Sequence, residues 1–152
     1  MRGCYVLFIT LSDPKTISVG RRSAAEFAAG EYAYVGSALG GLEARLCRHW
    51  RKEKRLHWHI DYLLREASSE KAIFARTCEH IECQLARFFS ERFSFIPRFG
   101  ASDCQCCSHL FWSPDQEDLV TATRAAFRAC GVKPEILTHS VKKTLTCGRD
   151  SY

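Results

Sequence analysis

Two apolar runs rich in β-branched and aromatic residues, at positions 4–11 and 32–38, restrict the fold of this chain more than any other feature. Runs of this length and composition are typical of β-strands. Asp13 and Pro14 form a turn signal after the first run. A shorter candidate strand follows at residues 16–19, and we expect it to form a hairpin with residues 4–11. The first part of the chain is therefore predicted to form three strands.

Helical periodicity dominates the remainder of the chain. Apolar residues recur at helical spacing in four segments, residues 42–54, 59–66, 79–92 and 115–130. Two further short strands are expected, at residues 72–77 and 109–112. The chain contains no internal repeat and no linker rich in Gly, Pro or Ser. We predict one α+β domain over residues 1–135 and a C-terminal tail over residues 136–152.

Positive charge is concentrated in one part of the sequence. The net charge is +5, and residues 45–55 contain six basic side chains against the single acid Glu53. A basic cluster of this kind suits an anionic partner such as nucleic acid phosphate. A solvated helix face would account for the same charges equally well.

The cysteine content and the absence of long apolar stretches indicate the compartment. No stretch is long enough to predict a membrane span, and the apolar run at the N-terminus is too short and too quickly followed by Asp13 for a signal peptide. Nine cysteines form an odd and unevenly spaced set. We therefore expect reduced thiols and a cytoplasmic protein.

Titratable and cationic residues follow the strands closely. Tyr5 and Tyr34 lie in the two long runs, and the helix expected after the second run carries Arg45, Arg48 and His49. This order would place proton-transfer groups beside phosphate-binding groups, the combination that phosphodiester chemistry requires. Aromatic residues are also common in half-buried strands, so the tyrosines alone do not establish a site.

An ordered set of motifs is similar to those of a known superfamily. The segments Gly3-Cys4-Tyr5 and Tyr34-Val35-Gly36 resemble the two motifs of the GIY-YIG nucleases, with Cys and Val in place of Ile. Residues 30–38, 57–63 and 99–104 resemble one small branch of that superfamily, long catalogued as a domain of unknown function and sometimes fused to endonuclease III-type glycosylases. The likeness covers roughly residues 3–112, most of the chain.

This resemblance implies a fold and a set of catalytic residues. The fold would be α+β, with a small antiparallel sheet of three strands flanked by helices. Tyr5 and Tyr34 would help to activate water, together with His49, and Arg45 would bind the scissile phosphate. Glu82 would hold one divalent metal ion, Mg²⁺ or Mn²⁺. The residues expected to contact the substrate are Tyr32, Gly36, Ser37, Arg48, Lys52 and His57.

We therefore expect a divalent-metal-dependent endonuclease that hydrolyses DNA, with RNA as an open alternative and DNA repair proteins as candidate partners. Two features leave the identity of the metal ligands undecided. Glu79 lies on the same face as Glu82 in the predicted helix. Many relatives also carry an asparagine near the end of the domain, but this chain contains none. Ser102 and Asp103 are the candidates for the equivalent position. A nucleic-acid-binding module without turnover is therefore the principal alternative.

A cluster of thiols near the end of the domain offers a different chemistry. Cys104, Cys106, Cys107 and His109 carry zinc-ligating atoms, but their spacing is tighter than that of paired CxxC knuckles. Cys78 and Cys83 would be irregular additional ligands. We favour buried structural thiols over a zinc-binding adaptor and over a catalytic cysteine beside His109.

Overall fold

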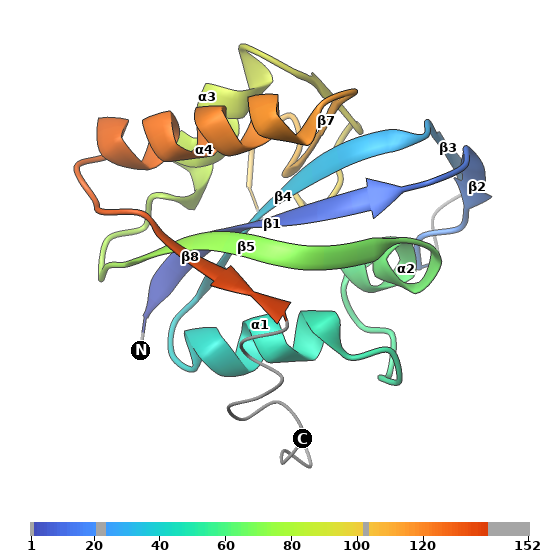
Figure 1. Ribbon diagram of the computed structural model, residues 1–152, viewed down its shortest axis with the longest axis horizontal. Helices are drawn as coiled ribbons and strands as arrows, with labels where there is room; N and C mark the ends of the chain where they lie inside the picture. Colours follow the sequence, from blue (N-terminus) through green and yellow to red (C-terminus); the bar gives the residue numbers. More distant parts are fainter. Residues whose placement is uncertain (1, 21–23, 102–103, 140–152) are drawn as a thin grey trace.

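The central element of the protein is an antiparallel sheet of six strands. The computed structural model describes residues 2–20, 24–101 and 104–139 (Figure 1). Within these residues the strand order is β6-β7-β4-β1-β5-β8. The strands are β1 (Gly3–Leu11), β4 (Gly30–Ala38), β5 (Ser68–Arg76), β6 (Ser94–Phe95), β7 (Leu110–Ser113) and β8 (Glu135–Thr138). All neighbouring strands run antiparallel.

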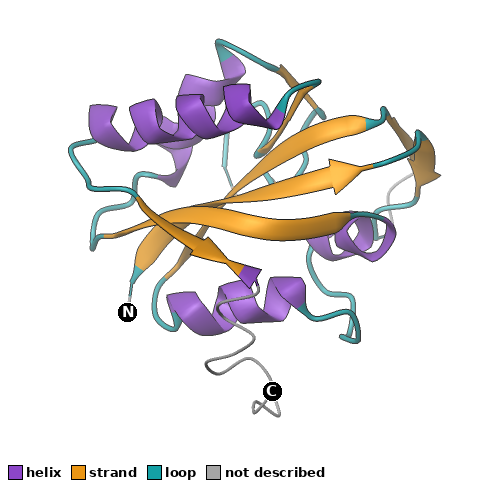
Figure 2. Cartoon of the chain, viewed as in Figure 1, coloured by secondary structure: helices purple, strands orange, loops and turns teal. Residues whose placement is uncertain are grey.

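Helices cover both faces of this sheet. Helices α1 (Leu42–Trp50) and α2 (His59–Glu66) lie on one face, and α3 (Glu82–Ser90) and α4 (Gln116–Ala129) lie on the other (Figures 1 and 2). Successive residues of β1 therefore enter different cores: those at positions 5, 7 and 9 join the first, and those at 4, 6 and 8 join the second. A strand buried on both faces must be apolar throughout, which explains the unbroken run at residues 4–11.

The prediction of an α+β fold is confirmed, but the prediction of a three-stranded sheet is wrong. β1 pairs with β4 and β5, and it does not form the expected hairpin with residues 16–19. Instead, β2 (Lys15–Ile17) pairs with β3 (Ala25–Phe27) in a separate two-stranded sheet. The side chain of Phe27 is buried, so this small sheet packs against the core through Phe27.

Helix α1 is shorter than its apolar pattern predicts. It ends at Trp50 instead of near residue 54, and Arg51 already has an extended backbone. Lys54 folds back and donates hydrogen bonds from Nζ to the carbonyl oxygens of Arg48 and His49, at 3.1 and 2.7 Å. A lysine that satisfies carbonyls of the last turn stabilises the end of a helix, so a residue expected inside the helix terminates it.

Helix α3 begins three residues later than expected, at Glu82 instead of residue 79. Glu79 lies in the turn before the helix, where its backbone N–H donates to Oγ1 of Thr77. Glu79 and Glu82 therefore do not share a helix face. The position of Glu82 in the first turn places its carboxylate at the positive end of the helix dipole.

The C-terminal part of the fold extends further than the predicted domain. Asp115 caps α4 by accepting a hydrogen bond from the N–H of Glu117. Strand β8 then adds to the edge of the sheet beside β5. Residues 136–138, assigned to the tail by their lack of periodicity, thus belong to the sheet, and the ring of His139 stacks on Trp50 at 5.3 Å. Residues 140–152 lie outside the described residues.

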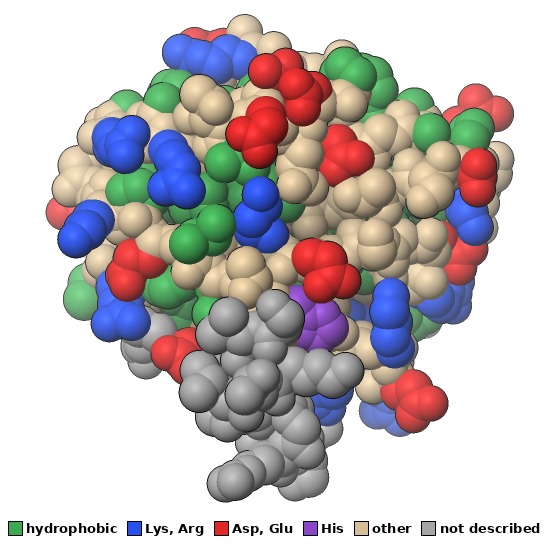
Figure 3. Space-filling model, in the orientation of Figure 1, with side chains coloured by type: hydrophobic (Ala, Val, Ile, Leu, Met, Phe, Trp, Pro, Cys, Tyr) green, Lys and Arg blue, Asp and Glu red, His purple; other side chains and the backbone are tan. Residues whose placement is uncertain are grey.

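The surface carries charges of both signs. On the face seen in Figure 3, acidic and basic side chains are interspersed, and hydrophobic side chains lie between them. None of the described helices is long and apolar enough to span a membrane.

Candidate functional site

A cavity of about 400 Å³ is lined by residues of β1, β4 and α1, of the start of α2, and by the first residue of α3. Four of the five residues predicted to be catalytic line it, and they come from four different elements. The lining residues that the sequence predicted are Tyr5, Tyr34, Gly36, Ser37, Arg45, His57 and Glu82. The fold therefore brings together in one place residues that are as many as 77 positions apart, from Tyr5 to Glu82.

The register of the two central strands explains why the second motif contains a glycine. Gly36 lies directly opposite Tyr5 in the β1–β4 pair. A Cβ atom at position 36 would lie 2.5 Å from the ring and the hydroxyl of Tyr5, closer than atoms can approach. The missing side chain creates the space in which the Tyr5 ring lies across the sheet.

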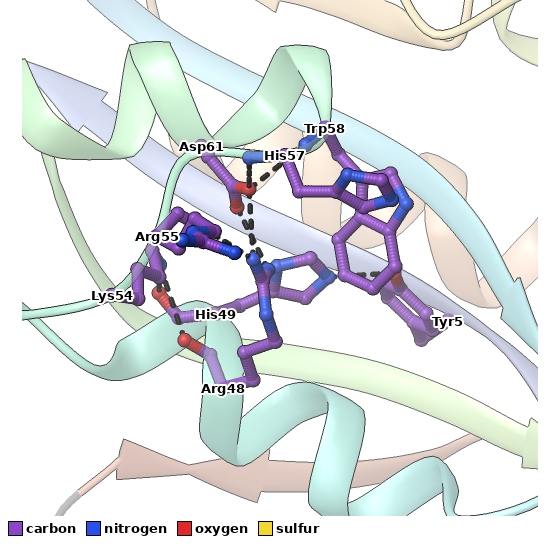
Figure 4. Close-up of polar contacts among 8 residues, drawn as sticks. All are labelled: Tyr5, Arg48, His49, Lys54, Arg55, His57, Trp58 and Asp61. Carbon is purple, nitrogen blue, oxygen red and sulfur yellow. Dashed lines mark hydrogen bonds and ion pairs between the residues drawn. The ribbon is translucent and has the colours of Figure 1, made fainter. Parts of the chain in front are cut away.

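Tyr5 is hydrogen-bonded to His49 behind the cavity. The Tyr5 hydroxyl lies 2.7 Å from Nε2 of His49, and both side chains are only 2% exposed (Figure 4). Burial raises the pKa of Tyr5 well above its usual value, and the neighbouring Tyr34 raises it further. Burial, with the nearby charge of Lys54, lowers the pKa of His49 to about 3. At neutral pH the pair is therefore a protonated phenol and a neutral imidazole.

Arg45 is held at the wall of the cavity by two contacts. Its Nη1 donates a 2.6 Å hydrogen bond to the carbonyl oxygen of Ser37, and its guanidinium carbon lies 4.7 Å from the centre of the Trp58 ring. One contact fixes an end of the guanidinium fork and the other fixes its plane. The remaining N–H groups of Arg45 can donate to an anion in the cavity.

Glu82 is the one acidic residue that lines this cavity among the described residues. Its Oε2 accepts a 2.7 Å hydrogen bond from the hydroxyl of Ser37, and its Oε1 lies 3.1 Å from Nδ1 of His109. Burial raises the pKa of Glu82, but the contacts with His109 and Ser37 outweigh it and hold the pKa below its usual value. The side chain is 28% exposed, so an ionised carboxylate faces the cavity.

Arg48 is engaged in an internal ion pair. Its guanidinium donates two hydrogen bonds to Asp61, from Nη1 to Oδ1 at 2.9 Å and from Nη2 to Oδ2 at 3.0 Å (Figure 4). Asp61 is fully buried and also accepts from the backbone N–H groups of His57 and Trp58 at the start of α2. Arg48 therefore joins α1 to α2, and it does not line the cavity as a substrate contact would.

Two other expected substrate contacts lie away from the cavity. The hydroxyl of Tyr32 donates to the carbonyl oxygen of Ala28 at 2.6 Å, and its ring packs in the core against Phe27. Lys52 is exposed in the segment after α1, where its Nζ lies 3.5 Å from the carbonyl oxygen of Ala67. Ser102 and Asp103, suggested above as replacements for an asparagine, lie outside the described residues.

Comparison with known families supports a single assignment. The family described as "Domain of unknown function DUF123" matches residues 4–132, which is most of the chain. The protein belongs to the DUF123 family. Comparison with curated proteins and with solved structures found no significant match.

The cavity of this DUF123 domain contains residues that the sequence did not single out. Trp58 lies between two guanidinium groups, at 4.7 Å from Arg45 and 4.4 Å from Arg48. His59 accepts a 3.1 Å hydrogen bond at Nδ1 from the backbone N–H of Gly100, which closes another side of the cavity. Residues 57–63 belong to the motifs that carry the resemblance, but of these residues only His57 was expected to contact the substrate.

The DUF123 domain also contains a second polar cluster, next to the cavity. One ligand atom from each of Cys83, Cys104, Cys106 and His109 lies within 4.8 Å of the others, so this group could hold a metal ion. The sequence prediction named Cys107 among the four main candidates and Cys83 only as an irregular additional ligand. Cys107 is exposed and is not part of the group, whereas the first turn of α3 brings Cys83 to it.

Proposed function

We propose that this protein is a divalent-metal-dependent endonuclease that hydrolyses phosphodiester bonds in DNA. The observation that carries the proposal is the convergence of Tyr5, Tyr34, Arg45 and Glu82 on one cavity. These are the residues to which the resemblance to GIY-YIG nucleases assigns water activation, phosphate binding and metal binding. The cavity is also lined by His57, just before α2, and by His59, the first residue of α2.

Arg45 binds the scissile phosphate in this proposal. Its guanidinium is oriented by Ser37 and Trp58 before the substrate arrives, so little conformational freedom is lost on binding. A charged donor held in this way stabilises the negative charge that builds on the phosphate oxygens during attack. The basic residues at positions 45–55, Arg48 aside, attract the DNA backbone over a longer range.

Glu82 is the residue that would hold Mg²⁺ or Mn²⁺. The residues present fit such an ion, because Glu82 is ionised and partly exposed, and a single carboxylate with waters and substrate phosphate is a common ligand set for Mg²⁺. When bound, the ion would act as a Lewis acid on the phosphate and lower the pKa of coordinated water. Ser37 and His109 position the carboxylate from two sides.

Tyr5 and His49 move the proton. The Tyr5 phenol keeps its proton at neutral pH, so the Tyr5 oxygen accepts a proton from water as its own passes to Nε2 of His49. His49 is neutral and offers Nε2 as the acceptor, and the negative charge of a phosphate bound by Arg45 would raise the low pKa of His49 and so favour this transfer. Burial keeps the pKa of Tyr5 high, and the charge of Arg45 offsets part of that rise, which stabilises negative charge on the phenol oxygen during the transfer. Tyr34 supplies a second hydroxyl in the same cavity, and its ring centre lies 6.5 Å from that of Tyr5.

A DNA-binding module without turnover is the second candidate. The sequence contains no asparagine to complete the metal shell found in many relatives. Both carboxylate oxygens of Glu82 also have protein neighbours, Ser37 and His109, which compete with a metal ion for them. In this alternative the cavity binds phosphate through Arg45 and does not cut.

Incubation of the full-length protein with plasmid, single-stranded and lesion-bearing DNA, and with RNA, tests the proposal. We expect strand breaks in at least one DNA substrate with Mg²⁺ or Mn²⁺, and none when the metal is chelated. Salt-dependent DNA binding without cleavage under any condition would favour the second candidate. Cleavage that survives chelation would contradict the role of Glu82.

A further inference from the structure

Three thiols and one imidazole converge at the boundary between α3 and the loop that joins β6 to β7. Cys104, Cys106 and His109 come from the loop, and Cys83 is the second residue of α3. One ligand atom of each lies within 4.8 Å of the other three. Cys83 is exposed, Cys104 and Cys106 are half-buried, and His109 is 2% exposed, so the group extends from the surface to a buried imidazole.

The loop is held in shape by bonds that do not involve the thiols. The guanidinium of Arg98 donates from Nη1 to the carbonyl oxygens of Cys104 and Cys106, at 3.1 and 2.9 Å. The backbone N–H of Arg98 donates to the carbonyl oxygen of Cys107 at 2.7 Å, and that of His109 donates to Phe99 at 2.8 Å. These bonds leave the sulfur atoms of Cys104 and Cys106 beside the His109 ring, with Sγ of Cys104 3.5 Å from Nε2.

The two nitrogen atoms of His109 have different surroundings. Nε2 faces the thiols, whereas Nδ1 lies 3.1 Å from Oε1 of Glu82. A histidine that ligates a metal through one nitrogen usually donates its other N–H to a carboxylate, which fixes the tautomer and the ring orientation. Glu82 occupies the place of that carboxylate.

We infer that Cys83, Cys104, Cys106 and His109 form a structural zinc site. Three thiolate sulfurs and one imidazole nitrogen are a complete tetrahedral ligand set for Zn²⁺, with no position left for water or substrate. The ligand atoms need to move only slightly from their present positions, because sulfur ligands lie about 2.3 Å from zinc. A disulfide would use only two of the three sulfurs and would give no role to the buried imidazole.

The site would connect two elements that are far apart in the sequence. Zinc would tie the first turn of α3 to the β6–β7 loop, and through His109 it would orient the carboxylate of Glu82. The inference does not depend on the proposed nuclease activity, because it rests on the ligand set alone.

Metal content of the full-length protein, purified with reductant and without chelator, tests the inference. We expect one zinc per chain in the wild type and loss of zinc in Cys106→Ser. Cys107→Ser is the matched control: it removes a thiol from the same loop but outside the group, and it should keep its zinc. Zinc at well below one per chain in the wild type, or full zinc in Cys106→Ser, would overturn the site.

If Cys106→Ser does not fold, replacement of zinc by cobalt in the wild-type protein provides a second test of the site. After removal of zinc, Co²⁺ should give the visible absorption of a tetrahedral site and a sulfur-to-metal charge-transfer band in the near ultraviolet. A six-coordinate cobalt spectrum, or a Cys104–Cys106 disulfide that persists with reductant and blocks metal uptake, would overturn the site. Both readouts are independent of DNA cleavage.

Discussion

Tyr5 and His49 share a 2.7 Å hydrogen bond between a phenol oxygen and an imidazole nitrogen, although they lie 44 positions apart in the chain. The other ring nitrogen of His49, Nδ1, is buried without a hydrogen-bond partner among the described residues. A buried polar pair of this kind is costly to keep, and in the proposed mechanism it carries the proton.

Removal of the Tyr5 hydroxyl should impair cleavage specifically. We expect Tyr5→Phe to lower the cleavage rate by about 10²- to 10⁴-fold, the usual contribution of a proton-transfer group. Tyr32→Phe is the matched control, because its hydroxyl bonds to the Ala28 carbonyl outside the cavity. Equal rates for the two variants in a single-turnover assay would contradict the role of Tyr5.

The buried His49 should make the protein less stable in acid. Its pKa in the folded protein, about 3, lies below the ordinary value of 6.5, so between these pH values the unfolded chain binds a proton that the folded chain does not. The free energy of unfolding should therefore fall as the pH falls through this window, by about 1.4 kcal/mol per pH unit from this residue. The groups that face His49 are Tyr5, Lys54, Asp61, Arg48 and Arg45.

Denaturant titrations of the wild type and His49→Gln between pH 6 and about pH 4 measure this contribution. In the variant, the free energy of unfolding should depend less steeply on pH. The difference in slope should correspond to the uptake of about one proton on unfolding. Parallel curves for the two proteins would show that His49 is not the group responsible.

The Arg48–Asp61 pair should matter more for stability than an ion pair on the surface. Asp61→Asn leaves the Arg48 guanidinium without its buried partner, and we expect a loss of about 3–5 kcal/mol in the free energy of unfolding. Glu66→Gln is the control, because Glu66 pairs with Arg65 at 3.8 Å on the exposed side of α2, where about 0–1 kcal/mol is usual. Similar losses in both variants, measured by denaturant unfolding, would contradict the structural role of the buried pair.

A methyl group at position 36 should displace the Tyr5 ring. In Gly36→Ala the added Cβ would lie 2.5 Å from the ring, so the strand or the ring must move. We expect a loss of about 1–3 kcal/mol in stability, typical of overpacking, together with loss of cleavage. Gly40→Ala is the control, because nothing lies within 4 Å of its added Cβ. If both variants have wild-type stability and activity, the close approach of Tyr5 to Gly36 is not a requirement.

The strands and helices of the centre were predictable from sequence because their apolar patterns are long. Three short strands, β3, β6 and β8, were not: they contain two to four residues each, too few for a periodic signal. Lys54 continued a helical pattern, yet its amine terminates α1 by binding two carbonyls. The spacing of apolar residues carries no information about a hydrogen bond between a lysine side chain and backbone carbonyls.

The residues of the candidate site were also only partly predictable from the sequence. Motif order located Tyr5, Tyr34, Arg45 and Glu82, which all line the cavity. Local charge was misleading for Arg48, because its partner Asp61 lies 13 positions away on another helix. The metal-ligating group was misjudged for a related reason: Cys107 is adjacent in sequence, but Cys83 is adjacent in space.

The cleavage rate of Glu82→Gln beside that of Glu79→Gln tests the central claim most directly. Both variants replace one carboxylate by an amide near the start of α3, but only Glu82 lines the cavity with Tyr5 and Arg45. In single-turnover reactions with Mg²⁺ at saturating DNA, we predict that Glu82→Gln loses more than about 10²-fold in rate. Glu79→Gln should cut like the wild type. Undiminished cleavage by Glu82→Gln, or an equal loss in both variants, would contradict the proposal that Glu82 holds the catalytic metal ion.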